Sequence, residues 1–216
     1  LADVEPKDKE KHLEEFRWAM QNGAIPAGRI MSNAGAQEYK PETSLINCVV
    51  SGDIEDSMDD ILRKVHEAGL SLKAGCGIGY CFSALRPKGA YVSGAGATTS
   101  GPLSFMDIYD KMCFTVSSAG GRRGAQMGTF DVSHPDVLDF IKAKREDGRL
   151  RQFNLSLLIT EDFMTAVKTD SMWKLTFPIL EKDFKESYVE GKDFVWKEQA
   201  AAKGFATNAE GLVACK

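Results

Sequence analysis

Five cysteines are the residues of this chain best suited to redox chemistry, because thiolates are strong nucleophiles and pairs of thiols can release electrons as disulfides. Cys48 follows Asn47 inside an apolar run, so it is either an inert core residue or a functional thiol. Cys81 and Cys113 are expected to be core residues. No Cys-x-x-Cys pair occurs, and the three histidines lie far from paired cysteines, so no metal site is expected. The odd number and irregular spacing favour free thiols in a reduced, cytoplasmic protein.

Two glycine-rich stretches could let the backbone approach a ligand closely. The run 75–79 (Gly-Cys-Gly-Ile-Gly) does not fit a dinucleotide-binding fingerprint, because its glycines follow a helix and precede a strand. It is either a plain turn or a point of close contact with a ligand. The stretch 120–124 (Gly-Gly-Arg-Arg-Gly) is either a solvated loop or a ligand loop, since arginine forks suit a phosphate or a base edge.

The elements that must position these residues alternate between helix and strand along the chain. This alternation predicts an α/β fold with a mainly parallel sheet or barrel. His134 precedes a proline at a helix start and is expected to be structural. The predicted elements are a helix at 8–22, an irregular stretch at 25–35, a strand at 45–50, a helix at 56–73, a strand near 82–85, a helix at 102–118, a strand at 126–132, a helix capped by Ser133 with Pro135 in its first turn, a strand at 153–159, a helix at 161–168 and a strand at 173–177.

The composition is that of a globular chain. Of the 216 residues, 43% are hydrophobic and 27% charged, and a chain of this length can bury a sizeable core. No apolar run approaches the roughly 20 residues of a membrane span, and the net charge of −4 argues against a general grip on nucleic acid. The first residue is Leu1 and the end lacks a stop signal, so we expect a segment of a longer polypeptide. Lys, Glu and Ala dominate 183–203, where we expect a peripheral helical insertion.

Eight motifs together resemble the large catalytic subunit of ribonucleotide reductase, in order and in spacing, from about residue 25 to residue 178. The similarity is greatest to the adenosylcobalamin-dependent class of that family. The motifs are 47–48 (Asn-Cys), 54–58 (Ile-Glu-Asp-Ser-Met), 74–79 (Ala-Gly-Cys-Gly-Ile-Gly), 85–89 (Leu-Arg-Pro-Lys-Gly), 100–106 (Ser-Gly-Pro-Leu-Ser-Phe-Met), 120–125 (Gly-Gly-Arg-Arg-Gly-Ala), 133–136 (Ser-His-Pro-Asp) and 153–156 (Phe-Asn-Leu-Ser).

The resemblance implies a ten-stranded α/β barrel made of two parallel five-strand halves, of which this chain is the first half. The implied organisation is an N-terminal helix at 1–24, the barrel half with an allosteric specificity site at 25–182, and a peripheral insertion or the start of the next segment at 183–216. In the family, a thiyl radical abstracts a ribose hydrogen. A cysteine pair then supplies two electrons to remove the 2'-hydroxyl and ends as a disulfide. Cys48 matches the first cysteine of that pair.

Other roles are implied position by position. Gly28 stands where some relatives carry a hydroxyl residue, which puts a side-chain contact there in doubt and draws attention to the nearby Ser32. The implied substrate-binding residues are Ser32, Asn47, Cys76 and Gly77. The implied effector-binding residues are Asp56, Ser57, Met58, Arg86, Lys88, Val92, Arg122 and Arg123, of which the last two lie in a loop that links effector base to substrate base.

The family's radical cysteine lies in an Asn-Pro-Cys-Gly-Glu string, which this sequence lacks, so the segment is expected to be inactive by itself. The resemblance implies adenosylcobalamin as cofactor, bound outside this segment. It also implies a ribonucleoside di- or triphosphate substrate, a deoxynucleoside triphosphate effector, a thioredoxin-type reductant and the remainder of the reductase chain. The helices at 57–73 and 102–118 could form a homodimer face, although packing on the barrel explains their apolar stripes equally well. No membrane or nucleic-acid partner is expected.

Two other hypotheses remain open from the sequence. The chain could be a non-catalytic nucleotide-binding module from a split or degenerate reductase gene, which a companion chain carrying the Asn-Pro-Cys-Gly-Glu loop would argue against. It could instead be a thiol-redox or flavin protein with a redox pair among Cys48, Cys76 and Cys81. Differential alkylation of these three cysteines would reveal such a pair.

Overall fold

The structure is a computed structural model that describes residues 1–36, 38–39, 44–116, 124–146, 149–178, 205–207 and 212–215. Its elements, in chain order, are η1 (Ala2–Val4), α1 (Lys9–Gln21), α2 (Gly28–Asn33), β1 (Cys48–Asp53), α3 (Met58–Lys73), β2 (Gly77–Cys81), β3 (Tyr91–Val92), η2 (Ser93–Ala95), β4 (Ala97–Thr98), α4 (Pro102–Thr115), β5 (Gln126–Asp131), α5 (Val137–Glu146), β6 (Phe153–Leu158), α6 (Glu161–Lys168), β7 (Leu175–Pro178), β8 (Phe205–Thr207) and β9 (Leu212–Cys215).

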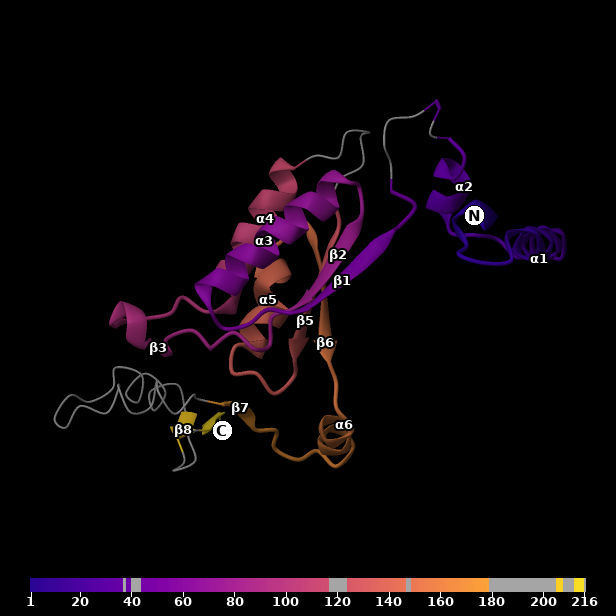
Figure 1. Cartoon of the computed structure of the whole chain (residues 1–216). Coiled ribbons are helices and arrows are strands. Elements are labelled where there is room, and N and C mark those ends of the chain that lie inside the picture. Colours follow the sequence, from indigo (N-terminus) through magenta and orange to yellow (C-terminus); the bar gives the residue numbers. More distant parts are fainter. Residues whose placement is uncertain are drawn as a thin grey trace.

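A parallel sheet of four strands, in the order β1-β2-β5-β6, is the centre of the fold. Helix α3 connects β1 to β2, α4 lies between β2 and β5, and α5 connects β5 to β6. These three helices cover one face of the sheet (Figure 1). The predicted α/β class with a parallel sheet is therefore confirmed. Parallel strands need such long crossovers, which explains why helices separate them in the sequence.

Alternation along the strands decides which side chains meet the helices. In β2, Ile78 and Tyr80 are buried, whereas Gly77, Gly79 and Cys81 are only half-buried. The buried set faces α3–α5, because successive side chains of a strand point to opposite faces. The other set belongs to what we call the open face. Its members are Cys48, Val50, Gly77, Gly79, Cys81, Met127, Thr129 and Asn154, and they follow from the strand register.

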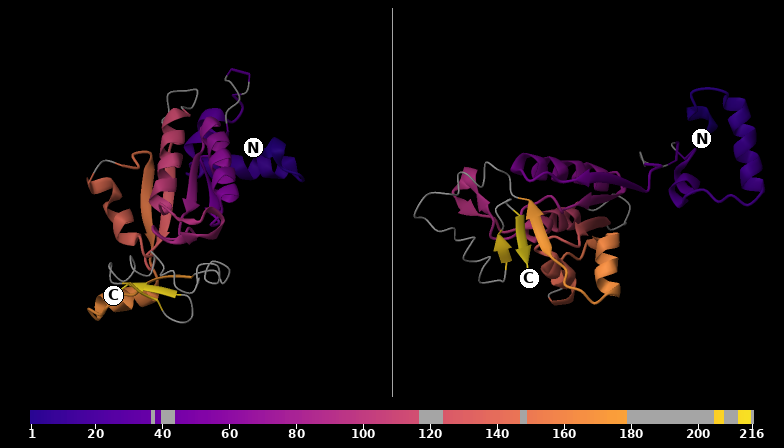
Figure 2. Two further views of the ribbon diagram at one scale, coloured as in Figure 1. Left: turned by 90° about the vertical axis from the view of Figure 1, so that its left-hand side faces the viewer. Right: turned by 90° about the horizontal axis from the view of Figure 1, so that it is seen from below.

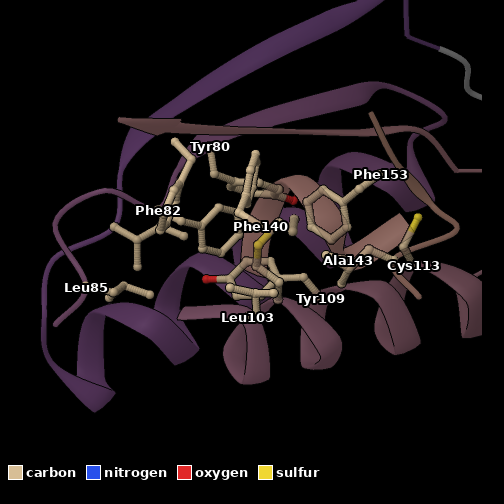
Figure 3. Close-up of a cluster of buried hydrophobic side chains, with 14 of the residues drawn as sticks. Tyr80, Phe82, Leu85, Leu103, Tyr109, Cys113, Phe140, Ala143 and Phe153 are labelled. Atoms are coloured by element: carbon tan, nitrogen blue, oxygen red, sulfur yellow. The ribbon is translucent and has the colours of Figure 1, made fainter. Parts of the chain in front are cut away.

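The core between the sheet and the helices is rich in aromatic rings (Figure 3). Tyr80 and Tyr109 meet edge to face with ring centroids 5.0 Å apart, and Phe82 contacts Tyr109 in the same way at 5.4 Å. The Tyr109 hydroxyl donates to the Ile61 carbonyl of α3 at 2.8 Å, and the Tyr80 hydroxyl donates to Gln126 at 3.1 Å. These buried hydroxyls are thus satisfied. The Tyr109 bond joins α4 to α3, and the Tyr80 bond joins β2 to β5.

Local signals in the sequence account for both ends of α3. The Ser57 hydroxyl accepts the Asp60 N–H at 3.2 Å, which is an N-cap. Gly75, with φ of 75°, ends the helix in a left-handed turn in which Gly75 and Cys76 return their N–H groups to Leu72 and Ser71. Gly75 therefore serves as a turn. The predicted helix at 56–73 is confirmed.

The structure corrects three expectations in the first half of the chain. The stretch expected to be irregular contains the short helix α2, whose start at Gly28 carries none of the usual capping residues. Strand β1 begins at Cys48 and not at residue 45. Gly77 and Gly79 lie within β2 and do not precede it. Glycine weakens a strand, so its presence here indicates close approach of other groups.

The helix after β5 also begins later than predicted, at Val137. Ser133 is not its cap, because its hydroxyl donates to Asp131 at 2.6 Å. The Asp136 N–H is instead accepted by Nδ1 of His134 at 3.0 Å. The side chain that organises this turn is therefore the histidine.

The two ends of the chain differ from the centre. Helix α1 is confirmed at its predicted place and stands apart from the sheet with α2 (Figures 1 and 2). Strand β7 pairs antiparallel with β9, which pairs with β8. The helical insertion predicted for 183–203 lies outside the described residues. None of the helices in the described ranges is both long and apolar enough to cross a membrane.

Candidate functional site

The Cys48 thiol lies at the start of β1, on the open face of the sheet. Val49 is partly buried against the helical core, whereas Cys48 and Val50, its neighbours on either side, are exposed. Exposure together with a place on a regular strand separates Cys48 from the inert-core alternative. The strand presents the thiol to whatever covers the open face.

Gly77, which has no side chain, lets this thiol lie close against the β2 backbone. The two residues are partners in the β1–β2 ladder, and the Gly77 N–H donates to the Asn47 carbonyl at 2.8 Å. A Cβ at position 77 would lie 3.0 Å from Cys48 Sγ and 3.4 Å from the Ala125 carbonyl oxygen. Any side chain there would crowd the thiol. The structure thus brings together Asn47, Cys48 and Gly77, as the sequence predicted.

The three other cysteines whose side chains the structure describes are in different surroundings, and like Cys48 they are free thiols. Cys76 is buried and its thiol donates to the Ile46 carbonyl at 3.2 Å, so it does not share the exposure of Cys48. Cys113 is a core residue, as predicted, and burial raises the pKa of its thiol to about 11. Cys81 is only half-buried, which differs from the expected core position, because it faces the open side of β2 and donates to Ser83 at 3.2 Å.

Ser32 lies on α2, a segment that precedes β1. It is exposed, and its hydroxyl is 3.0 Å from the Asn33 side-chain oxygen. Helix α2 reaches the rest of the chain through Arg29, which donates to the Gly75 carbonyl, and through Asn33, which donates to the Ser44 carbonyl at 3.1 Å. The predicted substrate residue Ser32 therefore lies on a helix that Arg29 joins to Gly75, just before β2.

A second set of predicted residues meets beyond the other end of β1, and we call it the Asp56–Arg86 corner. It comprises Asp56, Ser57, Met58, Arg86, Lys88 and Val92. The Arg86 Nε donates to Asp56 Oδ2 at 2.5 Å, and the Arg86 N–H donates to the other oxygen at 3.3 Å. Arg86 also donates from Nη1 to the Tyr91 carbonyl at 2.6 Å. With side chains 14% and 23% exposed, Arg86 and Asp56 form a partly buried pair.

The remaining members of the corner surround this pair. Ser57 caps α3, and Met58, the first residue of that helix, is exposed. The Lys88 N–H donates to Asp136 Oδ2 at 2.7 Å. Val92 belongs to β3 and pairs with Ala97 of β4. Two segments that the resemblance assigned to one effector site, 56–58 and 86–92, are therefore joined by the Asp56–Arg86 pair.

Sequence reasoning missed the residues that brace the corner from behind. His134 is 2% exposed, accepts the Asp136 N–H at Nδ1 and so donates from Nε2 to the Leu85 carbonyl at 2.9 Å. Burial lowers its pKa to about 4, so the ring is neutral at pH 7. Together His134 and Asp136 fix the backbone on both sides of Arg86. The Ser-His-Pro-Asp motif was the available signal, and its expected structural role for His134 agrees with these contacts.

Arg122 and Arg123 lie outside the described residues, so their predicted role stays a prediction. Within the described ranges, no group of three or more His, Cys, Asp or Glu side chains is arranged to hold a metal ion. The described residues therefore place an exposed thiol at one end of β1 and a partly buried ion pair beyond the other end.

Comparison with known proteins gives a consistent result. Residues 46–208 match the family model "Ribonucleotide reductase, barrel domain". The vitamin B12-dependent ribonucleoside-diphosphate reductase of Mycobacterium tuberculosis is 39% identical over 176 residues, which cover 81% of this chain and 25% of that protein. The protein of the same name from Thermoplasma acidophilum is 37% identical over 162 residues, covering 74% of this chain and 20% of the relative. The chain spans about a quarter of the length of these curated relatives.

A solved structure supports the fold. The class Id ribonucleotide reductase alpha subunit of Actinobacillus ureae matches 72% of this chain and 27% of its own, with a TM-score of 0.59 and 22% identity. At that identity the likeness concerns the arrangement of strands and helices alone.

Proposed function

Because this chain belongs to the ribonucleotide reductase family, we propose that it is part of an enzyme that reduces ribonucleotides to deoxyribonucleotides. The observation that carries the proposal is the position of Cys48, an exposed thiol on the open face that lies against Gly77, where any side chain would crowd it. The family match favours this function over a non-catalytic nucleotide-binding module. The relatives named above are ribonucleoside-diphosphate reductases, so we propose a ribonucleoside diphosphate as substrate.

In the proposed reaction Cys48 is one of two thiols that supply the electrons. Each thiol gives up one hydrogen, a disulfide forms, and the ribose loses its 2'-hydroxyl as water while a hydrogen takes its place. Atoms and electrons balance, because one two-electron oxidation accompanies one two-electron reduction. The partner cysteine lies in the remainder of the reductase chain. A thioredoxin-type reductant then restores both thiols.

Strand geometry suits this role. A thiol on a loop would sample many positions, whereas β1 holds the Cys48 backbone through its ladder with β2. Gly77 has no side chain to crowd the thiol, and its N–H donates to the Asn47 carbonyl, which holds Asn47 in place beside Cys48. The open face can then admit a ribose against the strand.

The Asp56–Arg86 corner is proposed to bind a deoxynucleoside triphosphate effector. Asp56 is a hydrogen-bond acceptor for a deoxyribose hydroxyl, and Arg86 and Lys88 are cations for the phosphates. In the structure Asp56 already orients Arg86, whose Nη1 is also held by Tyr91. The corner is thus organised before any nucleotide arrives, which lowers the entropy lost on binding.

A homodimer through α3 and α4 is part of the proposal. The two helices pack side by side, yet they leave large apolar side chains in solvent. These are Met58, Leu62 and Leu70 on α3 and Ile108 and Phe114 on α4, each between 41% and 65% exposed. Such a surface is typical of an interface with another subunit. The Asp56–Arg86 corner lies at the end of the same helix, so a second subunit would border the effector.

The described residues do not fit a cobalamin. Two cavities on this part of the chain measure about 160 and 540 Å³, and both are lined by residues of α4 and its surroundings, not by Cys48. We therefore derive no step through the cofactor. When bound elsewhere in the protein, adenosylcobalamin would supply the radical that starts the reaction.

The test is the substitution Cys48→Ser in the complete reductase. Multiple turnover with a thioredoxin-type reductant should be abolished, because serine cannot form the disulfide. Substrate affinity should change little, since serine is close to cysteine in size. Cys81→Ser, also on the open face, is the matched control and should retain turnover. Sustained wild-type turnover in Cys48→Ser would rule out the proposed role.

A further inference from the structure

Strand β1 contains an irregularity between Cys48, its first residue, and Asp53, its last. Its ladder with β2 pairs Val50 with Gly79 but Gly52 with Tyr80, so Ser51 is an extra residue. Gly52, with φ of 83°, completes this bulge. A bulge interrupts the ladder and leaves backbone groups that need other partners.

Lys64 of α3 supplies that partner. Its side chain is nearly buried, and its Nζ donates both to the Ser51 carbonyl oxygen and to the Ser51 hydroxyl, the latter at 2.8 Å. The Glu67 carboxylate, one turn further along α3, lies 3.7 Å from the same Nζ. Burying an ammonium group is costly unless it is paired and hydrogen-bonded, so this lysine is held in one place by the groups it satisfies.

The bulge decides which face each residue of β1 occupies. Val49 and Ser51 face α3, whereas Cys48 and Val50 are on the open face. Because side chains alternate, a shift of the strand by one residue would turn the Cys48 thiol from the open face toward the helices. Whatever fixes the bulge at Ser51 therefore also fixes the thiol three residues earlier.

We propose that Lys64 is a positioning residue for Cys48, which it keeps on the open face by fastening the β1 bulge to α3. The same helix is capped by Ser57 and begins at Met58, both in the Asp56–Arg86 corner, so Lys64 is also a direct physical link from that corner to the thiol strand. The relevance of the link to reduction rests on the proposed function. The positioning itself does not, and it can be tested without any nucleotide.

The experiment compares Lys64→Met with wild type in the complete reductase, without nucleotide. Methionine keeps the apolar stem and removes the donor. Hydrogen exchange at the β1 amides should accelerate by about tenfold or more, the factor for losing a hydrogen bond from a charged group. Peptide-resolved alkylation should show a slow fraction of Cys48 that wild type lacks, since part of the population has the strand shifted. Cys76 labelling should not change.

Lys73→Met is the matched control, because Lys73 is an exposed lysine on the same helix. It should leave both readouts at wild-type values. Ser51→Ala removes only the hydroxyl contact and should produce a smaller change in the same direction. If Lys64→Met accelerates exchange in β5 and β6 as well, the variant has lost its fold. The milder variant Ser51→Ala then provides the test of the proposal. The proposal is overturned if Lys64→Met folds and shows wild-type exchange in β1 together with wild-type Cys48 labelling. If Lys64→Met does not fold, the same result in Ser51→Ala overturns it.

In the complete reductase the same variant separates positioning from binding. Misplacing a reacting group by about 1 Å can reduce a rate by about 100-fold, so Lys64→Met should lower kcat by about 10- to 100-fold and leave KM nearly unchanged. An unchanged kcat would overturn the role in catalysis. Because Cys48→Ser tests the redox role separately, a failure of this inference can be told from a failure of the proposed function.

Discussion

The two candidate sites, at opposite ends of β1, are built in contrasting ways. At the start of the strand, Cys48 is exposed and lies against Gly77, where any side chain would crowd it. Beyond the end of the strand, Asp56 and Arg86 are already paired, and His134 and Asp136 hold the backbone around them. The Cys48 thiol is thus exposed at one end of β1, whereas the charged groups beyond the other end are already paired with each other.

This difference follows from the work that each end is proposed to do. A redox thiol must reach a substrate and then a second cysteine, so groups that bury or bind it would compete with the reaction. A nucleotide corner gains from preorganised charges, because binding then orders fewer side chains. The Asp56–Arg86 corner should therefore be weakened by the loss of any contact that braces it. The reactivity of Cys48 should instead be lowered by any group added beside its thiol.

The largest expected effect is acid destabilisation through His134. Its pKa is about 4 in the folded chain against about 6.5 in the unfolded chain. Between these values the unfolded chain binds more protons, so the free energy of unfolding should fall as the pH drops from about 6.5 to about 4, by up to about 3 kcal/mol, and not further below. Urea unfolding of wild type and His134→Gln at several pH values measures this.

Comparing wild type with His134→Gln isolates the contribution of the histidine, because the carboxylates titrate equally in both proteins. The difference between wild type and His134→Gln should shrink as the pH falls through that window. A difference that stays constant from pH 7 to pH 4 would mean that His134 does not brace the corner in its neutral form.

A smaller effect is expected for Asp56→Ala in the complete reductase. The change removes an acceptor for the effector and also leaves Arg86 without its carboxylate. Effector affinity should fall by about 1–3 kcal/mol, or roughly 5- to 150-fold in dissociation constant. Isothermal titration calorimetry with a deoxynucleoside triphosphate measures it. Asp59→Ala, an exposed acid in the first turn of the same helix, is the control. Equal affinities for wild type and Asp56→Ala would remove Asp56 from the site.

The smallest effect is expected at the thiol end, for Gly77→Ala. The added methyl would lie 3.0 Å from Cys48 Sγ, so the thiol should turn to a less favourable rotamer. A rotamer cost of about 0.5–1.5 kcal/mol corresponds to a change of about 2- to 10-fold in Cys48 alkylation rate. Gly79→Ala, on the same face of β2, is the control. If both variants label like wild type, the lack of a side chain at Gly77 does not govern the thiol.

Elements with local signals were predictable from the sequence, and elements organised by distant contacts were not. The cap at Ser57 and the stop at Gly75 lie within the α3 segment itself, so that helix was predicted closely. The start of α5 was misplaced because His134, which also reaches Leu85, replaces Ser133 in organising the turn. The β1 bulge could not be seen either, since its partner Lys64 reads as an ordinary helical lysine.

In the candidate sites, too, the sequence predicted the residues but not the contacts between distant positions. The order of the motifs pointed to Cys48, Asp56 and Arg86, but not to the ion pair between the last two, which joins residues 30 positions apart. Hydrogen bonds of this range depend on how strands and crossovers bring loops together. The motifs of this segment did not point to the second cysteine of the proposed redox pair.

The most direct test of the central claim is to find the disulfide that Cys48 forms. The complete reductase, fully reduced, would be given a ribonucleoside diphosphate and its cofactor without any external reductant. After a single turnover, peptide mapping by mass spectrometry should find Cys48 in a disulfide with a cysteine of the remaining chain, in an amount equal to the deoxynucleotide formed. Deoxynucleotide produced while Cys48 stays a free thiol would contradict the account.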